Sequence, residues 1–378
     1  MAEKKLFVVD EAIPFLKGVL EPYGDVRYLP GREIGKAAVQ DASALLVRTR
    51  TRCDASLLAG SSVRFVGTAT AGMDHFDVPF LESSKIAWAN VPGCNSASVA
   101  QYVTSALLHL SARAHLPLEG KTLGIIGVGQ VGSKVQACAE ALGMRCLLCD
   151  PPRARAEGKR NFWYAMDMLP HCDVVTLHVP LIAQGPGMTL RLANGEFIQN
   201  MQPHAWLINA SRGSVLDNSA LRIALRAGSI GGAVLDVWEG EPDIDLGLLN
   251  TVNFATAHIA GYSQDGKANA TTGIVRSLAG ALGIRELENF TAAPEGALQP
   301  IVVDAQNKSV QDTVAEVYAQ TYDIAEDDAL LRGNPGAFEV LRAHYAPRRE
   351  PCAYTVELRH GNAFLAGKLT ALGFKVKA

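Results

Sequence analysis

The fold is decided by one stretch, Lys121-Thr-Leu-Gly-Ile-Ile-Gly-Val-Gly-Gln-Val-Gly132. Gly127, Gly129 and Gly132 give the spacing G-x-G-x-x-G between an apolar strand and an Ala-rich helix that stops at Gly143. The first glycine permits a tight turn, the second lets the backbone approach a pyrophosphate, and the third lets helix and strand pack closely. Because a helix N-terminus also offers N–H groups and partial positive charge, we predict a dinucleotide cofactor here.

Asp150 ends the following strand and predicts which dinucleotide is bound. A carboxylate at this place accepts hydrogen bonds from the ribose hydroxyls and repels a 2′-phosphate, which favours NAD over NADP. Arg153 and Arg155 lie nearby and weaken that preference. The alternative is that the glycines only form a turn in a doubly wound sheet. We expect NAD as the cofactor and no metal.

Composition bounds the remaining possibilities. The chain has 378 residues, more than one hydrophobic core usually serves, so two or three domains are expected. A net charge of −3 without a basic tract argues against nucleic acid or a membrane surface as a partner. The chain has neither an apolar run long enough to span a bilayer nor a signal peptide, and its seven cysteines are scattered, which predicts a cytoplasmic protein. Cys146 and Cys149 form a CxxC that we interpret as two strand thiols rather than a redox pair.

Short apolar runs alternate with amphipathic stretches, which predicts an α/β fold. We expect a Rossmann-type doubly wound parallel sheet, a discontinuous flavodoxin-like substrate domain and a small C-terminal α+β domain. The expected bounds are 1–95 and 259–289 for the substrate domain, 96–258 for the NAD-binding domain and 290–378 for the C-terminal domain. Strands are expected at Leu6–Val9, Ala44–Val47, Phe65–Ala69, Ile86–Ala89, Leu123–Ile126, Cys146–Cys149, Val174–Val179, Leu207–Asn209, Ala233–Val237, Asn253–Ala257 and Tyr354–Leu358. Long helices are expected at Ser96–Ala112, Tyr262–Leu282, Ser309–Ile324 and Ala363–Leu372.

Three polar segments follow strands of the second block, where ligands of open α/β sheets bind. They carry Arg212, Glu241 and His258. Oxidation of an alcohol needs a base for the hydroxyl proton, for which histidine is suited, and a neighbouring carboxylate orients the imidazole. An arginine fork binds a carboxylate bidentately. Taken singly each residue has a structural alternative, and Glu239 is chemically as good a candidate as Glu241.

These segments resemble the D-isomer-specific 2-hydroxyacid dehydrogenases over about residues 1 to 290. The resemblance rests on the glycine pattern with Asp150, on Asn209-Ala-Ser-Arg-Gly213, on Leu235-Asp-Val-Trp-Glu-Gly-Glu-Pro242 and on His258-Ile-Ala-Gly261. It implies that Arg212 and Glu241 are catalytic, the glutamate being the one before proline, and that His258 is the proton acceptor. The implied cofactor contacts are Gly127, Gly129, Gln130, Val131, Gly132, Asp150, Val179, Ala210, Ser211, Arg212, Asp236 and Gly261. Val179 departs from the family, which often has threonine there.

Within that family the resemblance is strongest to the branch that acts on 4-phospho-D-erythronate in vitamin B6 synthesis. It then spans nearly the whole chain, through Leu46-Val-Arg-Thr49, Phe65–Gly72, Asn90-Val-Pro-Gly-Cys-Asn95, His258–Tyr262 and, in the C-terminal region, Tyr322-Asp-Ile324, Asp327-Asp-Ala329 and Arg348-Arg-Glu350. Thr49, Thr70 and Tyr262 match substrate contacts, and the final domain resembles a dimerisation domain, so we expect a homodimer.

The substrate's phosphate needs cations. Arg48, Arg50 and Arg52 alternate with threonines, so an extended segment would put all three on one face as a phosphate site, or as a solvated edge strand. Arg348 and Arg349 are hypothesised to reach a partner subunit's active site.

The reaction implied is the oxidation of 4-phospho-D-erythronate to (3R)-3-hydroxy-2-oxo-4-phosphobutanoate, with the substrate in the cleft between the two α/β domains. Its carboxylate is expected to meet Arg212 and the N–H groups around Thr70–Gly72. One alternative is another D-2-hydroxyacid dehydrogenase, such as one for 3-phosphoglycerate. The other is a non-catalytic NAD-sensing scaffold.

Overall fold

The computed structural model describes residues 5–158 and 166–377. The described residues within 1–95 and 263–296 form one compact unit, and those within 96–262 and 297–378 form another. Each unit is built on parallel strands, so the predicted α/β class is confirmed. Among the helices of the described residues, none is both long and apolar enough to cross a bilayer.

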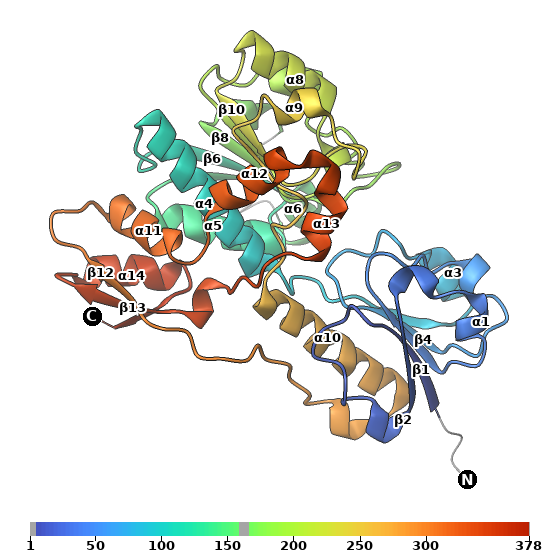
Figure 1. The fold of residues 1–378 in the computed structure, drawn as a ribbon. Helices are drawn as coiled ribbons and strands as arrows, with labels where there is room; N and C mark the ends of the chain where they lie inside the picture. The colour runs from blue at the N-terminus through green and yellow to red at the C-terminus, as the bar shows by residue number, and fades with distance from the viewer. Residues whose placement is uncertain (1–4, 159–165, 378) are drawn as a thin grey trace. The chain divides into compact units, whose positions relative to one another are not determined.

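The first unit is a five-stranded parallel sheet in the order β2-β1-β3-β4-β5, the flavodoxin-like order that was predicted. Helix α10 packs beside β4, where Gly67 leaves room for it, since a Cβ there would lie 2.6 Å from Ile274 Cδ1 (Figure 1). The strands are β1 (Lys5–Asp10), β2 (Gly24–Leu29), β3 (Ala44–Val47), β4 (Phe65–Thr68) and β5 (Ala87–Ala89). The helices are α1 (Lys36–Val39), α2 (Ala55–Leu58), α3 (Val78–Ser83) and α10 (Gln264–Leu282).

The edge strand β2 was not predicted. None of its six residues is fully buried, and Asp25 and Arg27 interrupt its apolar residues. An edge strand that is half exposed needs no apolar run, so periodicity does not mark it.

The second unit holds a six-stranded parallel sheet in the order β11-β10-β9-β8-β6-β7. Strand β6 lies between β7 and β8, so the strand order reverses at this place, and in open α/β sheets ligands bind at the carboxyl ends of the strands beside such a reversal. The strands are β6 (Thr122–Ile126), β7 (Arg145–Cys149), β8 (Val174–Leu177), β9 (Trp206–Asn209), β10 (Gly232–Leu235) and β11 (Phe254–Ala255). The helices are α4 (Ser96–Ala114), α5 (Gln130–Ala141), α6 (Pro151–Ala156), α7 (Gly195–Gln199), α8 (Asn218–Ala227) and α9 (Leu246–Leu249).

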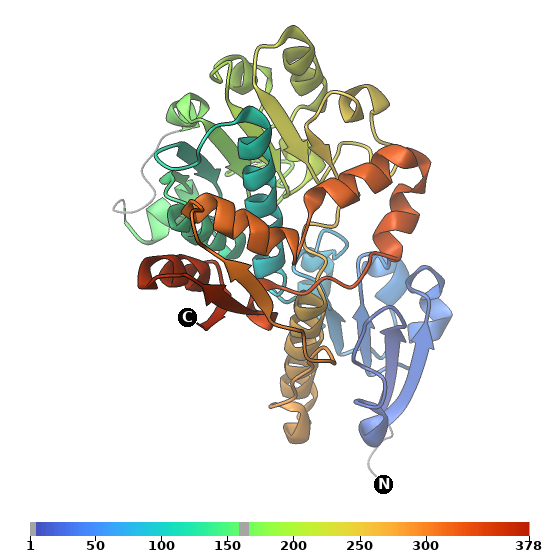
Figure 2. The ribbon, with the colours of Figure 1, turned by 60° about the vertical axis from the view of Figure 1, so that its left-hand side comes forward.

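The C-terminal segment has its own three-stranded parallel sheet, β12-β13-β14 (Figure 2). Its strands are β12 (Ile301–Asp304), β13 (Thr355–Arg359) and β14 (Lys375–Lys377), and its helices are α11 (Val310–Ala319), α12 (Ile324–Gly333), α13 (Phe338–Ala343) and α14 (Ala363–Ala371). The single helix predicted for Ser309–Ile324 is wrong, because the Asp323 carboxylate accepts from Ala325 N and begins a second helix there.

The division into units also differs from the expected bounds. Residues 259–262 and 297–378 belong to the second unit rather than to the substrate domain and to a separate domain. The reason is packing, since α11 and α12 contact α4, and α14 contacts α5. Asp328 of α12 accepts from Ala255 N of the sheet's outermost strand at 2.7 Å. Arg332 donates to the carbonyls of Leu249 and Val252.

The CxxC pair lies on β7, as expected. Burial raises the pKa of the Cys146 thiol to about 12 and that of Cys149 to about 11. Because only the thiolate is reactive, these are inert core thiols rather than a redox pair.

Candidate active site

The glycine-rich turn between β6 and α5 has the shape that a dinucleotide requires. Gly127 adopts a φ of +88°, and a Cβ there would lie 2.5 Å from the carbonyl oxygen of His178. A Cβ at Gly132 would lie 2.0 Å from the carbonyl oxygen of Gly127, so helix and turn touch. At Gly129 no neighbouring heavy atom of the described residues lies within 4 Å of the same position, so this side is open for a pyrophosphate. Gly129 also caps α5 without a side chain that could accept from the helix N–H groups.

Asp150 holds this turn through hydrogen bonds to its backbone. Its carboxylate accepts from Val128 N at 2.8 Å and from Arg153 N at 3.0 Å. The Arg153 guanidinium donates to the Val128 carbonyl and pairs with Glu157. Val179, the departure from the family, has its Cγ1 2.7 Å from where a Gly127 Cβ would stand. It therefore packs on the same turn.

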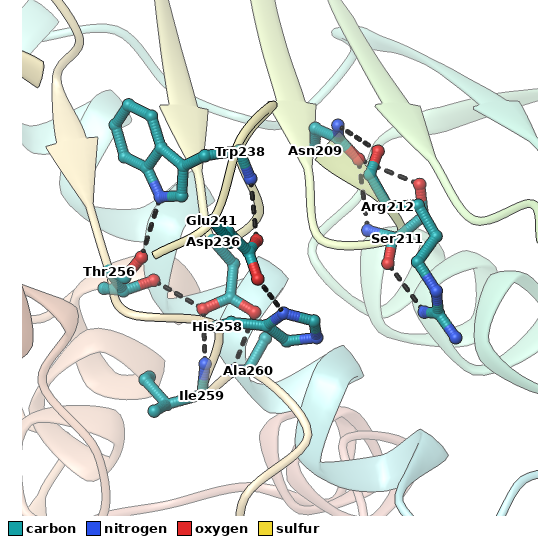
Figure 3. Close-up of polar contacts among 10 residues, drawn as sticks. All are labelled: Asn209, Ser211, Arg212, Asp236, Trp238, Glu241, Thr256, His258, Ile259 and Ala260. Atoms are coloured by element: carbon teal, nitrogen blue, oxygen red, sulfur yellow. Dashed lines mark hydrogen bonds and ion pairs between the residues drawn. The ribbon is translucent and has the colours of Figure 1, made fainter. Parts of the chain in front are cut away.

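His258 and Glu241 form the central pair of the site (Figure 3). His258 Nδ1 lies 2.7 Å from Glu241 Oε2, while Glu241 Oε1 accepts from Trp238 N at 2.9 Å. Burial raises the pKa of Glu241, but the hydrogen bond and charge of His258, the Trp238 N–H and the charge of Arg342 together lower it below its ordinary value. Because an ionised carboxylate only accepts hydrogen bonds, Nδ1 carries a proton, and Nε2 of the neutral ring is left as a base.

On chemistry alone Glu239 and Glu241 are equivalent candidates, the family resemblance implied Glu241, and the geometry separates the two. Glu239 lies 3.6 Å from Arg191, a partly exposed ion pair, and not at the histidine. Glu241 is the glutamate that contacts His258.

Arg212 stands on a turn after β9 that a buried amide shapes. Asn209 Oδ1 accepts from Ser211 N and Ser211 Oγ, and its amide nitrogen donates to the Arg212 carbonyl at 3.0 Å. A Cβ at Gly213 would lie 1.9 Å from the Trp238 carbonyl oxygen, so only glycine lets this turn touch the loop that leads to Glu241. In Figure 3 the imidazole edge with Nε2 is turned away from Glu241, toward the side of the view where Arg212 stands. Asn209 and Gly213 lie within a segment that the sequence singled out, but their roles were missed.

Asp236 is 1% exposed and positions the loop that carries His258. Its carboxylate accepts from Thr256 Oγ1 and Ile259 N, each at 2.7 Å, and from Ala260 N at 3.0 Å. Its carbonyl accepts from His258 N at 2.8 Å. Sequence reasoning expected a cofactor contact from Asp236 and did not find this structural one.

Tyr262 lies next to two side chains of the C-terminal segment. The guanidinium carbon of Arg342 lies 5.8 Å from the centre of its ring, and the Tyr345 ring meets it edge-on at 6.2 Å. Arg342 therefore brings positive charge close to the Glu241 end of the site. No sequence motif marked it.

In the first unit, the predicted arginine row is wrong. The strand ends at Val47, and Thr49 and Arg50 lie in a turn, so Arg48, Arg50 and Arg52 are not on one extended face. Arg48 donates to the carbonyl of Ala12, and Arg52 pairs with Asp54 at 2.8 Å. An alternating pattern predicts one face only where the backbone stays extended.

Thr70, in the turn after β4, is within hydrogen-bond distance of two partners. Its hydroxyl lies 2.7 Å from Thr68 Oγ1 and donates to the Gly72 carbonyl at 2.7 Å. Thr49, the other threonine expected to bind substrate, is exposed in the turn after β3.

Comparison with known proteins agrees with this geometry. Residues 99–260 match the family model described as "D-isomer specific 2-hydroxyacid dehydrogenase, NAD binding domain", and residues 293–373 match a domain of unknown function, DUF3410. Among solved structures, the TT0316 protein of Thermus thermophilus is 27% identical with a TM-score of 0.61, over 74% of this chain and 97% of its own. D-lactate dehydrogenase of Aquifex aeolicus, 24% identical with a TM-score of 0.62 over 77% of this chain and 100% of its own, shares the fold.

The fold and the site thus define the class, an NAD-dependent oxidoreductase of the D-2-hydroxyacid type. Among curated proteins, erythronate-4-phosphate dehydrogenase of Bacteroides fragilis is 44% identical over 92% of this chain and 98% of its own length. That of Cronobacter sakazakii is 43% identical over 97% of both. The chain therefore belongs to the erythronate-4-phosphate dehydrogenase family, as the resemblance of its motifs implied.

Proposed function

We propose that this protein oxidises 4-phospho-D-erythronate to (3R)-3-hydroxy-2-oxo-4-phosphobutanoate with NAD, on the route to pyridoxal 5′-phosphate. The observation that carries the proposal is the 2.7 Å contact of His258 with Glu241, in a chain 44% identical to an erythronate-4-phosphate dehydrogenase. A non-catalytic scaffold would have no need of an imidazole whose tautomer a half-buried carboxylate fixes.

The chain's own residues divide the chemistry as follows. Arg212 binds the substrate carboxylate and orients C2, because its planar fork matches a carboxylate. His258 Nε2 accepts the proton of the C2 hydroxyl, and Glu241 stabilises the imidazolium that forms. NAD, when bound at the glycine-rich turn, supplies the acceptor for the hydride that leaves C2.

We assign binding of the substrate's phosphate to Arg48 and Lys267. Burial and the charge of Arg48 lower the pKa of Lys267, so two cations of the first unit repel each other. A phosphate between them would offset that repulsion. In this assignment Arg48→Gln and Lys267→Gln raise KM for 4-phospho-D-erythronate more than KM for D-erythronate. Arg52→Gln is the matched control, because it removes the charge of a nearby arginine whose side chain is 77% exposed and pairs with Asp54.

The proposal is tested by following NADH absorbance with purified protein and three substrates, 4-phospho-D-erythronate, 3-phospho-D-glycerate and D-erythronate. We expect the highest kcat/KM with the first. A higher kcat/KM with 3-phosphoglycerate would show that 3-phosphoglycerate, and not 4-phospho-D-erythronate, is the substrate. NADH binding without turnover of any of the three would favour a scaffold.

We also propose a cytoplasmic homodimer that assembles through the C-terminal segment. All seven cysteines are free thiols, in keeping with a reducing compartment. Because α12 holds the edge of the nucleotide-binding sheet, deletion of the segment would damage that sheet. Charge reversal on the exposed strand residues Lys375 and Lys377 is the better test, with sedimentation velocity as readout. A variant as dimeric as the parent would exclude this face.

A further inference from the structure

Arg348 of the C-terminal segment lies against the loop that follows His258. Its side chain is almost fully buried, and its Nη2 donates to the Ala260 carbonyl at 2.6 Å and more weakly to the Ile259 carbonyl at 3.4 Å. The same nitrogen contacts the hydroxyl of Ser98, which itself donates to the Ala260 carbonyl at 2.8 Å. The Arg348 guanidinium carbon lies 4.2 Å from the centre of the Tyr322 ring. Arg348 therefore binds within its own chain, and the hypothesis that it reaches a partner's active site is wrong.

The backbone N–H groups of the same two residues, Ile259 and Ala260, are held by Asp236. Its carboxylate accepts from Ile259 N and Ala260 N, while Arg348 donates to the carbonyls of both residues. Figure 3 shows the Asp236 side of this arrangement directly beside the imidazole. The main chain next to His258 is thus bound from its N–H groups by an anion and from its carbonyl groups by a cation.

The loop needs such support because of its backbone conformation. His258 has a φ of +56°, in the left-handed region that residues other than glycine rarely adopt. Such a conformation persists only where its surroundings fix it. A rotation here would move Nδ1 away from Glu241 and Nε2 away from the substrate.

Burying the guanidinium of Arg348 costs desolvation free energy, which argues against an incidental position. Its Nε and Nη1 are buried without a hydrogen-bond partner in the described residues. Its charge is balanced by Asp236 and by Asp327, whose Oδ2 accepts from the hydroxyls of Tyr322 and Tyr345. A buried cation with unsatisfied donors does not stabilise a fold as well as apolar residues of similar volume would, so a functional reason is required.

We propose that Arg348 is a positioning residue for His258, so that the C-terminal segment of each chain orients the catalytic base of that same chain. The inference rests on the proposed role of His258. It gives the segment matched by the domain of unknown function a task in catalysis that is separate from assembly.

The test is a double-mutant cycle that joins Arg348→Lys with His258→Ala. Lysine keeps the positive charge but lacks the planar fork and differs in length, so it does not reproduce the hydrogen bonds to the Ile259 and Ala260 carbonyls. The net charge of the buried cluster stays the same. We expect kcat to fall by about 10–100-fold with KM for NAD and NADH affinity within twofold of the parent, since small misplacements of a catalytic group are costly. In the His258→Ala background the same change should alter the residual rate by less than about twofold, because the group that it positions is gone.

Arg332→Lys is the matched control. Arg332 comes from the same segment and also donates to two loop carbonyls, those of Leu249 and Val252, but that loop carries no proposed catalytic group. We expect it to lower the unfolding midpoint as much as Arg348→Lys does while kcat stays within about twofold of the parent. Ser98→Ala, which removes one donor to the Ala260 carbonyl, should give a smaller fall in kcat and serves if Arg348→Lys does not fold.

Two outcomes would overturn the inference. One is an unchanged kcat in Arg348→Lys and Ser98→Ala, and the other is an equal loss in the presence and absence of His258. The cycle compares rates on whichever 2-hydroxy acid the parent oxidises, so a wrong substrate leaves it valid. A parent that oxidises none of them would instead refute the proposed function.

Discussion

The glycine-rich turn at 127–132 and the histidine loop at 258–260 follow strands of one sheet, but they are held in opposite ways. The turn requires glycine, since a Cβ at Gly127 would lie 2.5 Å and a Cβ at Gly132 would lie 2.0 Å from a backbone carbonyl oxygen. The loop is held by charge, between the carboxylate of Asp236 and the guanidinium of Arg348. The glycines that shape the turn lie five positions apart, whereas the histidine loop is held by a guanidinium about ninety positions away in the chain.

The difference suits the two tasks. A cofactor turn must present bare backbone to a pyrophosphate, and side chains would obstruct it. A catalytic base must be held in one orientation, and hydrogen bonds to ionised groups give the direction that packing alone does not. Changes in the histidine loop are therefore expected to lower kcat, and changes in the glycine-rich turn are expected to lower stability or NAD affinity.

The largest effect is expected from His258→Ala. It should lower kcat by roughly 10²–10⁴-fold, the usual worth of one acid–base group, while the Kd for NAD stays unchanged because the glycine-rich turn is untouched. Steady-state kinetics and NADH fluorescence titration measure the two quantities. A kcat equal to that of the parent would remove His258 from its proposed role.

Two alanine substitutions in the glycine-rich turn test whether its glycines serve stability or NAD binding. Gly132→Ala should destabilise the protein by about 1–3 kcal/mol, since its Cβ meets the Gly127 carbonyl. Gly129→Ala should leave stability unchanged but weaken NAD binding by about tenfold or more, because only the bound pyrophosphate would meet the new methyl group. Urea unfolding and NAD titration separate them. Equal NAD affinity in Gly129→Ala and the parent would place the pyrophosphate elsewhere.

Asp150→Asn tests the side-chain support within the turn. The amide keeps an acceptor for Val128 N or Arg153 N but loses the charge that repels a 2′-phosphate. The ratio of kcat/KM for NADP to that for NAD should rise by about tenfold, an energy of about 1.4 kcal/mol. If the ratio is unchanged, a group other than Asp150 discriminates between the 2′-hydroxyl of NAD and the 2′-phosphate of NADP.

The smallest effect concerns stability and pH. The folded-state pKa of Glu241 is lowered from 4.5, so its contribution to stability is complete above that pH and is lost as pH falls through the folded value. Glu241→Gln should therefore cost about 1 kcal/mol at neutral pH, the gain from charge assistance, and the difference from the parent should shrink in acid. Glu239→Gln, at the Arg191 pair, should cost less. Unfolding curves at neutral and acidic pH check both, and a difference that grows in acid would contradict the sign.

Much of the nucleotide-binding unit could be predicted because its determinants are local. The βα turn, the buried strands and Asp150 are neighbours in sequence, and their periodicity follows from hydrogen-bond geometry. The half-exposed edge strand β2, the break between α11 and α12 and the turn at Thr49 were missed, since their stability comes from packing and caps rather than from an apolar pattern.

By itself, the sequence determined the parallel α/β class, the cofactor turn and the residue types that alcohol oxidation needs, because each depends on side chains close together in the chain. Only the tertiary structure decided that Arg348 lies behind His258, whereas the contact of Glu241 with that histidine agrees with what the family motif implied. Spacing along a chain carries no information about which distant charges meet. That is fixed by how helices of the C-terminal segment pack on α4 and on the sheet edge, where burial removes water and makes each charge need a partner.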